Sequence, residues 1–141
     1  MPKVPEQVEA EFENIERVLA EMPNCESLPG LSSLELAGVA ALIHNFYNGI
    51  ENILKLVTTS YGRKLPDSSS WHRDLIDLAN SNNVISESTA KELQQYLAFR
   101  HFFSHGYSFD LDKNRIIPLV RDIQKTLASF KNDINKTLKK I

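Results

Sequence analysis

The stretch Phe99-Arg100-His101-Phe102-Phe103-Ser104-His105-Gly106-Tyr107 combines aromatic residues with polar groups that can do chemistry. Six of the chain's twelve aromatic residues lie between Tyr96 and Phe109. Aromatic residues at this density normally belong to a core. An arginine and two histidines among them are costly to bury unless they are paired or used. We therefore expect the hydrophobic core and the chemistry of this protein to meet here.

The residues before Gly106 are typical of a helix end, because a glycine just past a helix adopts a left-handed backbone without steric cost. His101 and His105 are four residues apart and share one helical face. Arg100 and His105 lie about 140° apart around a straight helix, so they cannot form one tight cluster on it. Either the helix frays at Ser104, or a second copy of the chain completes the site.

Three interpretations of these polar residues remain open on spacing alone. The first is a helix end with polar side chains outward and phenylalanines inward. The second is a zinc site, since His-x-x-x-His is a zinc-ligand spacing. However, Phe102 replaces the Glu of the metalloprotease pattern, and no Cys or carboxylate has an obvious third-ligand spacing. The third is acid–base chemistry on a phosphodiester, with histidine moving protons and arginine neutralising charge.

The string Arg100-x4-His105-Gly106-Tyr107 resembles the Arg-x4-6-His motif of the HEPN superfamily, and most closely the Arg-x4-His-x-Tyr form of the HepT-like toxins. The stretches 42–51 and 70–75 are also similar to this family, and the resemblance covers roughly residues 31–135. It implies a small all-helical homodimer. It further implies a metal-independent endoribonuclease, which acts as the toxin paired with a nucleotidyltransferase antitoxin.

The resemblance assigns roles to the residues of the motif. Arg100 would clamp a phosphate, His105 would act as acid or base, and His101 would assist or orient. Ser104 and Tyr107 would bind RNA or be modified, since the antitoxin adenylylates the tyrosine of this motif in HepT-like proteins. The ribose 2′-OH would attack the adjacent phosphate and leave a 2′,3′-cyclic phosphate, so neither metal nor cofactor is expected. The alternative is a non-catalytic helical dimer or binding module with a HEPN fold.

Composition narrows the class of protein. The 141 residues suffice for one domain, and 42% hydrophobic and 24% charged residues are ordinary for a soluble globular chain. A lone Cys25 excludes an intrachain disulfide and fits a reducing cytoplasm. The sequence has no apolar run long enough for a membrane span and no signal-peptide pattern at its start. Since the net charge is −2, any RNA site must be local.

Apolar spacing predicts a helix over 6–22, a connection over 23–31 and a long helix over 32–60. We expect 1–30 to be an added helix and linker beside a core bundle of 31–141, all in one domain. Ser32 or Ser33 would cap the long helix. Gly38 and Gly49 inside it predict a close helix approach.

Polar residues of the long helix, namely His44, Asn45 and Glu51, could line a groove shared with the motif. His44 can equally be a satisfied core or interface histidine. The pattern also predicts a short helix capped by Ser70, from Trp71 to about 79, on which His72 and Arg73 are solvated. The motif helix follows from 85–86, and a last helix follows Asp112. The fold class is therefore all-α, an antiparallel up-and-down bundle of four main helices plus a short one.

Overall fold

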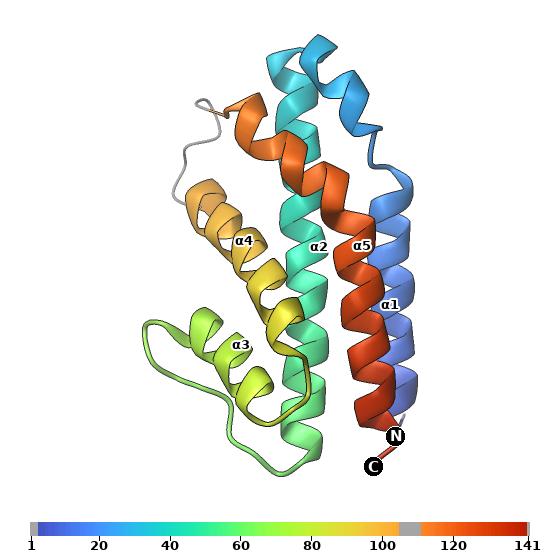
Figure 1. The fold of residues 1–141 in the computed structure, drawn as a ribbon, viewed down its shortest axis with the longest axis vertical. Coiled ribbons are helices and arrows are strands. Elements are labelled where there is room, and N and C mark those ends of the chain that lie inside the picture. The colour runs from blue at the N-terminus through green and yellow to red at the C-terminus, as the bar shows by residue number, and fades with distance from the viewer. Residues whose placement is uncertain (1–2, 105–110, 141) are drawn as a thin grey trace.

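The computed structural model describes residues 3–104 and 111–140, and every element within these ranges is helical. Four long helices alternate in direction along the bundle, α1 (Val4–Ala20), α2 (Ser33–Ser60), α4 (Glu87–Ser104) and α5 (Lys113–Leu138) (Figure 1). The short α3 (Trp71–Ser81) lies between α2 and α4 in the chain and packs on both. The predicted all-α bundle of four main helices plus a short one is confirmed.

Local capping explains where the long helix α2 begins. The Ser32 hydroxyl accepts a hydrogen bond from the Glu35 amide at 3.2 Å, and the Glu35 carboxylate accepts one from the Ser32 amide at 3.0 Å. These two bonds satisfy donors that have no partner within the helix. The bond from the Ser32 backbone also lowers the pKa of Glu35. The predicted start at Ser32 is therefore correct.

The predicted close helix approach occurs at Gly49 and not at Gly38. A Cβ atom added to Gly49 would collide with Cγ1 of Ile15 in α1, whereas one added to Gly38 would meet no atom within 4 Å. The glycine at position 49 thus lets α1 settle against α2 within one chain. Because Ile15 belongs to the same chain, this contact is not evidence for a dimer.

The connection predicted over 23–31 contains a 3-10 helix, η1 (Cys25–Gly30), in its interior. Asn24 begins it, because its side chain accepts a hydrogen bond from the Glu26 amide at 3.1 Å. Leu28 is fully buried and anchors this turn to the core. The helix propensity of so short a segment is weak, so tertiary burial decided its conformation.

The motif helix α4 is tied to α5 at two heights. At its start, the Ser86 hydroxyl accepts a hydrogen bond from the Thr89 amide. Asp133 of α5 accepts hydrogen bonds from the Ser86 amide and the Thr89 hydroxyl at 3.0 and 2.7 Å. Halfway along, the buried Tyr96 hydroxyl donates to the Leu119 carbonyl at 2.7 Å. These bonds set the rotation of α4, and hence the direction in which its functional side chains point.

The last helix begins where predicted, since the Asp112 side chain accepts a hydrogen bond from the Asn114 amide at 2.9 Å. Pro118 lies near its start, and the first turns of α5 are tilted relative to the rest of the helix (Figure 1). The predicted cap at Ser70 differs in its chemistry. The Ser70 hydroxyl bonds to the Asp74 carboxylate and not to a backbone amide.

No helix within 3–104 or 111–140 is long and apolar enough to cross a membrane.

Candidate functional site

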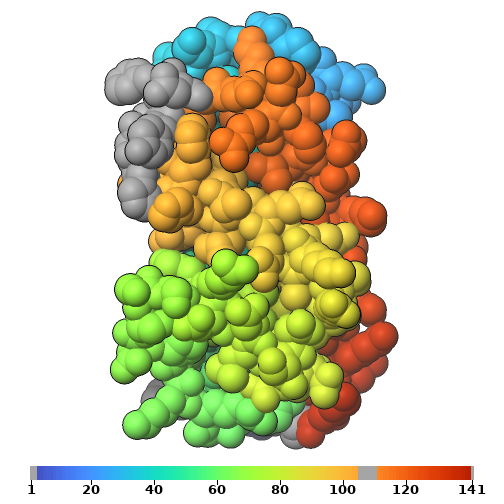
Figure 2. All heavy atoms as spheres, turned by 60° about the vertical axis from the view of Figure 1, so that its left-hand side comes forward, coloured from blue at the N-terminus to red at the C-terminus, as the bar shows by residue number. Residues whose placement is uncertain are grey.

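A cleft of about 480 Å³ lies between α3 and α4 and holds two residues of the predicted motif, Arg100 and His101. The two helices lie next to each other on one face of the molecule, α3 in green and α4 in yellow to gold (Figure 2). The Arg100 side chain is 23% exposed, so its guanidinium is in reach of a ligand in the cleft. Further residues that line the cleft are Ser69, Ser70, His72, Arg73, Gln94, Leu97 and Ala98.

A buried carboxylate, Glu51 of α2, lies beneath the cleft and contacts residues of both helices that line it. Its Oε2 lies 2.6 Å from Nδ1 of His72, and its Oε1 lies 3.8 Å from Nε of Arg100. The Glu51 side chain is only 4% exposed, and burial of a carboxylate is costly unless polar partners surround it. Three helices thus meet at one carboxylate.

Arg100 is attracted by Glu51 without being bound tightly to it. At 3.8 Å the pair is an ion pair but not a hydrogen bond, and the buried Nε of Arg100 has no hydrogen-bond partner among the described residues. The carboxylate therefore holds the base of the guanidinium in place. The planar fork of donors remains available for an oxyanion such as a phosphate.

The prediction that His72 is a solvated surface residue was wrong. Its side chain is 23% exposed, its Nδ1 faces Glu51, and its ring stacks on Trp71 with centroids 3.6 Å apart. A sequence signal for this existed, because His72 precedes the buried Leu75 and Ile76 by three and four residues and so belongs to their face of α3. Its neighbour Arg73 is exposed, as predicted.

His44 and Tyr47 of α2 complete the surroundings of the Glu51–Arg100 pair. Burial lowers the pKa of His44 most, the Arg100 charge lowers it further, and Glu51 opposes both. Burial raises the pKa of Tyr47 far above its usual range, Glu51 adds to this, and Arg100 opposes it. Neither the buried Nδ1 of His44 nor the Tyr47 hydroxyl has a hydrogen-bond partner in the described parts of the chain.

The ring of His44 also stacks on Phe103 near the end of α4, with centroids 5.4 Å apart. His44 thus contacts the motif helix, as the proposed shared groove requires. Its neighbour Asn45 does not, because it lines a hollow on the other side of α2 together with Asn48 and Gly49, facing α1. Adjacent residues on a helix point about 100° apart, and only one of the two faces α4.

The sequence-predicted site is therefore brought together in part. The structure gathers Glu51, Arg100 and His101 at or beneath one cleft, with His44 beside them. Ser104 is exposed in the last described turn of α4. The predicted His105 and Tyr107 lie outside the described residues.

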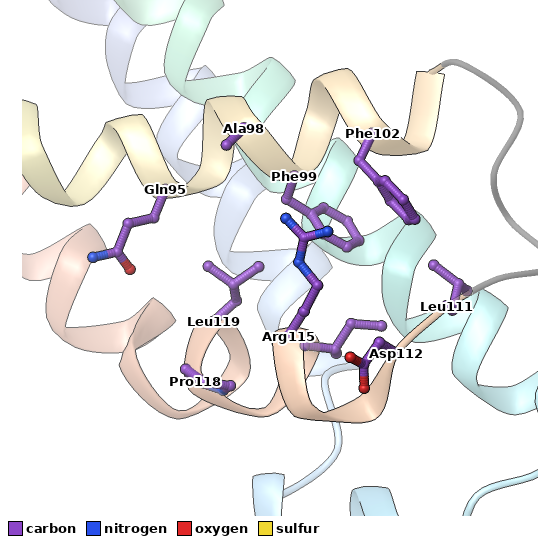
Figure 3. A pocket seen from close by; sticks show the side chains of 10 residues that line it. Gln95, Ala98, Phe99, Phe102, Leu111, Asp112, Arg115, Pro118 and Leu119 are labelled. Carbon is purple, nitrogen blue, oxygen red and sulfur yellow. The ribbon is translucent and has the colours of Figure 1, made fainter.

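A second hollow of about 220 Å³ lies between α4 and the start of α5, and Ala98 lines both it and the cleft. Phe102 of α4 and Arg115 of α5 point toward each other across it, with the guanidinium carbon 5.3 Å from the ring centroid (Figure 3). Phe99, Leu111 and Leu119 make its walls largely apolar. The two hollows thus occupy neighbouring sides of the same helix.

No group of three or more His, Cys, Asp or Glu within 3–104 and 111–140 is placed to hold a metal ion. In comparison with known proteins, a family model described as HepT-like protein matches residues 38–141. No curated protein and no solved structure matches the chain. The match begins inside α2 and includes every residue of the cleft, whereas α1 and η1 precede it.

Proposed function

The chain belongs to the HepT-like protein family, and from this membership and the cleft around Arg100 we propose that it is a metal-independent endoribonuclease. We further propose that it is the toxin of a pair whose antitoxin is a nucleotidyltransferase. The observation that carries the proposal is the arginine of the motif itself. Arg100 lines an open cleft, and its Nε lies 3.8 Å from the buried carboxylate of Glu51. The remaining donors of its guanidinium are available to a phosphate.

The proposed reaction uses protein groups alone. The ribose 2′-OH attacks the adjacent phosphorus, the bond to the 5′-oxygen breaks, and a 2′,3′-cyclic phosphate forms. A base takes the proton of the 2′-OH and an acid protonates the leaving oxygen, roles that suit histidine near neutral pH. The fork of Arg100 would stabilise the charge that grows on the phosphoryl oxygens. His105 and His101 are the motif residues proposed for proton transfer.

The second hollow is the reason why we propose single-stranded RNA as the substrate. An RNA strand whose phosphate meets Arg100 would pass over Ala98, the residue common to both hollows, on its way to Phe102 and Arg115. An aromatic ring beside a guanidinium suits a nucleobase, which stacks on flat groups without demanding one sequence. Local contacts of this kind fit a chain with a net charge of −2 better than a broad basic surface would.

Control of the activity is proposed at Tyr107, which lies two residues beyond His105. Its adenylylation by the antitoxin would add a charged phosphodiester beside a site that binds phosphates. Arg100 would then pair with the attached phosphate in place of RNA. A second copy of the chain would supply a further motif histidine, since Arg100 and His105 cannot cluster on one straight helix.

The test is single-turnover cleavage of RNA in the presence of a chelator. Arg100→Ala and His105→Ala should each slow cleavage by about 10²–10⁴. Arg100→Lys keeps the charge but loses the fork, so it should recover only part of the loss. Arg121→Ala is the matched control, because Arg121 is an exposed arginine of α5 that lines neither hollow.

The products should end in 2′,3′-cyclic phosphate. A folded wild-type chain without any cleavage would refute the nuclease and favour the alternative, a non-catalytic binding module. Loss of all activity on chelation would refute the metal-free mechanism.

A further inference from the structure

The ring of His72 is held in the cleft by two contacts that leave one nitrogen for chemistry. Its Nδ1 lies 2.6 Å from Oε2 of Glu51, and its face stacks on Trp71 at 3.6 Å. Its side chain lines the same cleft as Arg100. We propose that His72 is a catalytic base of this cleft, with Glu51 as its positioning residue. The inference rests on the proposed ribonuclease function.

The tautomer follows from the partner of Nδ1. A carboxylate can only accept a hydrogen bond, so Nδ1 of His72 carries the hydrogen and donates it to Glu51. In the neutral ring, Nε2 then holds the lone pair. This is the arrangement in which a buried carboxylate orients an imidazole so that its other nitrogen can take a proton.

One carboxylate positions both His72 and Arg100. The two oxygens of Glu51 face the two side chains, one oxygen each, so the guanidinium and the imidazole are placed next to each other at the cleft. A phosphodiester clamped by Arg100 would therefore bring its flanking ribose near His72. A single side chain of α2 thus couples the proton-accepting and phosphate-binding groups of α3 and α4.

His72 would act in the first proton transfer of the proposed reaction. Nε2 of His72 takes the hydrogen of the ribose 2′-OH as the 2′-oxygen forms its bond to phosphorus. The bond from phosphorus to the 5′-oxygen breaks, and the motif histidine His105 donates a proton to that oxygen. The two proton-transfer roles are then divided between His72 of α3 and a histidine of the motif.

A purely structural role, in which His72 only pins α3 to α2, makes different predictions. His72→Gln separates the two roles, because the glutamine amide can still donate to Glu51 but cannot take a proton near neutral pH. Asp77→Asn is the matched control, an exposed position on the same helix that lines neither hollow. Thermal unfolding of each variant shows whether α3 remains docked.

The deciding assay compares ordinary RNA with RNA that carries a 5′-bridging sulfur at the cleavage site, a leaving group that needs no acid. His72→Gln should cut ordinary RNA about 10²–10⁴ more slowly than the wild type and should stay slow on the sulfur substrate. His105→Ala should be slow on ordinary RNA but largely restored on the sulfur substrate. Asp77→Asn should match the wild type on both.

Glu51→Gln tests the positioning role. The neutral amide oxygen accepts more weakly from Nδ1 than the carboxylate does, and the amide nitrogen can donate to Nδ1, so the variant should shift the ring toward the tautomer that carries hydrogen on Nε2. Nitrogen-detected NMR of the histidine rings measures that shift directly, whether or not RNA is cut. An unchanged tautomer in Glu51→Gln would refute the positioning role.

Failure of this inference and failure of the nuclease proposal are distinguishable. If the wild type cuts RNA and a folded His72→Gln variant cuts it within threefold of the same rate, His72 is not the base although the nuclease stands. Rescue of His72→Gln by the sulfur substrate would likewise overturn the assignment, since it would make His72 the acid. A wild type that cuts no RNA would refute both proposals together.

Discussion

Replacement of Gly49 by alanine tests the packing of α1 against α2. The added Cβ would collide with Cγ1 of Ile15 and lie 2.9 Å from its Cδ1. Ile15 is 1% exposed, so relief of this contact requires a core side chain to shift. Extra atoms forced into a filled core cost about 1–3 kcal/mol. Alanine in place of glycine inside a helix gains about 1 kcal/mol, which offsets part of that cost.

Gly38→Ala is the matched control on the same helix. Gly38 is exposed, and an added Cβ would have no neighbour within 4 Å, so this variant should gain about 1 kcal/mol of stability. The propensity gain is common to both variants. The difference between their free energies of unfolding therefore isolates the collision at Gly49 and should be about 1–3 kcal/mol.

The assay is urea unfolding followed by circular dichroism, with midpoints compared at unchanged slope. In an Ile15→Ala background the nearest side-chain atom left beside Gly49 would be the Cβ of residue 15, at 3.9 Å. There Gly49→Ala should stabilise as Gly38→Ala does, and the double-mutant cycle should show the collision as a coupling of about 1–3 kcal/mol. If Gly49→Ala stabilises the otherwise wild-type chain as much as Gly38→Ala does, the described approach of α1 to α2 is wrong.

Two further predictions concern buried polar groups. Tyr96→Phe should cost about 1–2 kcal/mol in urea unfolding because it leaves the Leu119 carbonyl without its donor, whereas Tyr47→Phe should be neutral or stabilising because it removes an unpartnered hydroxyl. Equal losses of unfolding free energy in Tyr96→Phe and Tyr47→Phe would contradict the assigned hydrogen bonding of the two hydroxyls. Because the pKa of His44 is lowered in the folded chain, this residue contributes stability above its ordinary pKa of 6.5 that is lost as the pH falls toward the folded value. His44→Phe should therefore lose less stability between pH 7 and 5 than the wild type. If the free energies of unfolding of the two proteins fall in parallel over this range, the lowered pKa of His44 does not contribute to the loss.

The sequence alone was enough to predict the α-helices and most of their starts. Ser32 with Glu35 and Asp112 with Asn114 are capping interactions between residues a few positions apart, so contiguous sequence contains both partners. Apolar residues that step by three and four predicted which face of each helix is buried, because that face follows from helical geometry. The resemblance carried by the motif likewise needs only contiguous residues, and the family match over 38–141 confirms the family.

Only the tertiary structure decided which faces meet. His72 and Glu51 are 21 residues apart, and no local rule pairs an expected surface histidine with a carboxylate on another helix. His44 and Asn45 are neighbours in the chain, yet one contacts Phe103 of α4 and the other faces α1. Gly38 and Gly49 read alike in sequence, but only the second has Ile15 against it. The physical reason is that periodicity fixes the angle of a side chain about its own helix, whereas its partner depends on how the neighbouring helices are rotated, which is set by packing of the whole core.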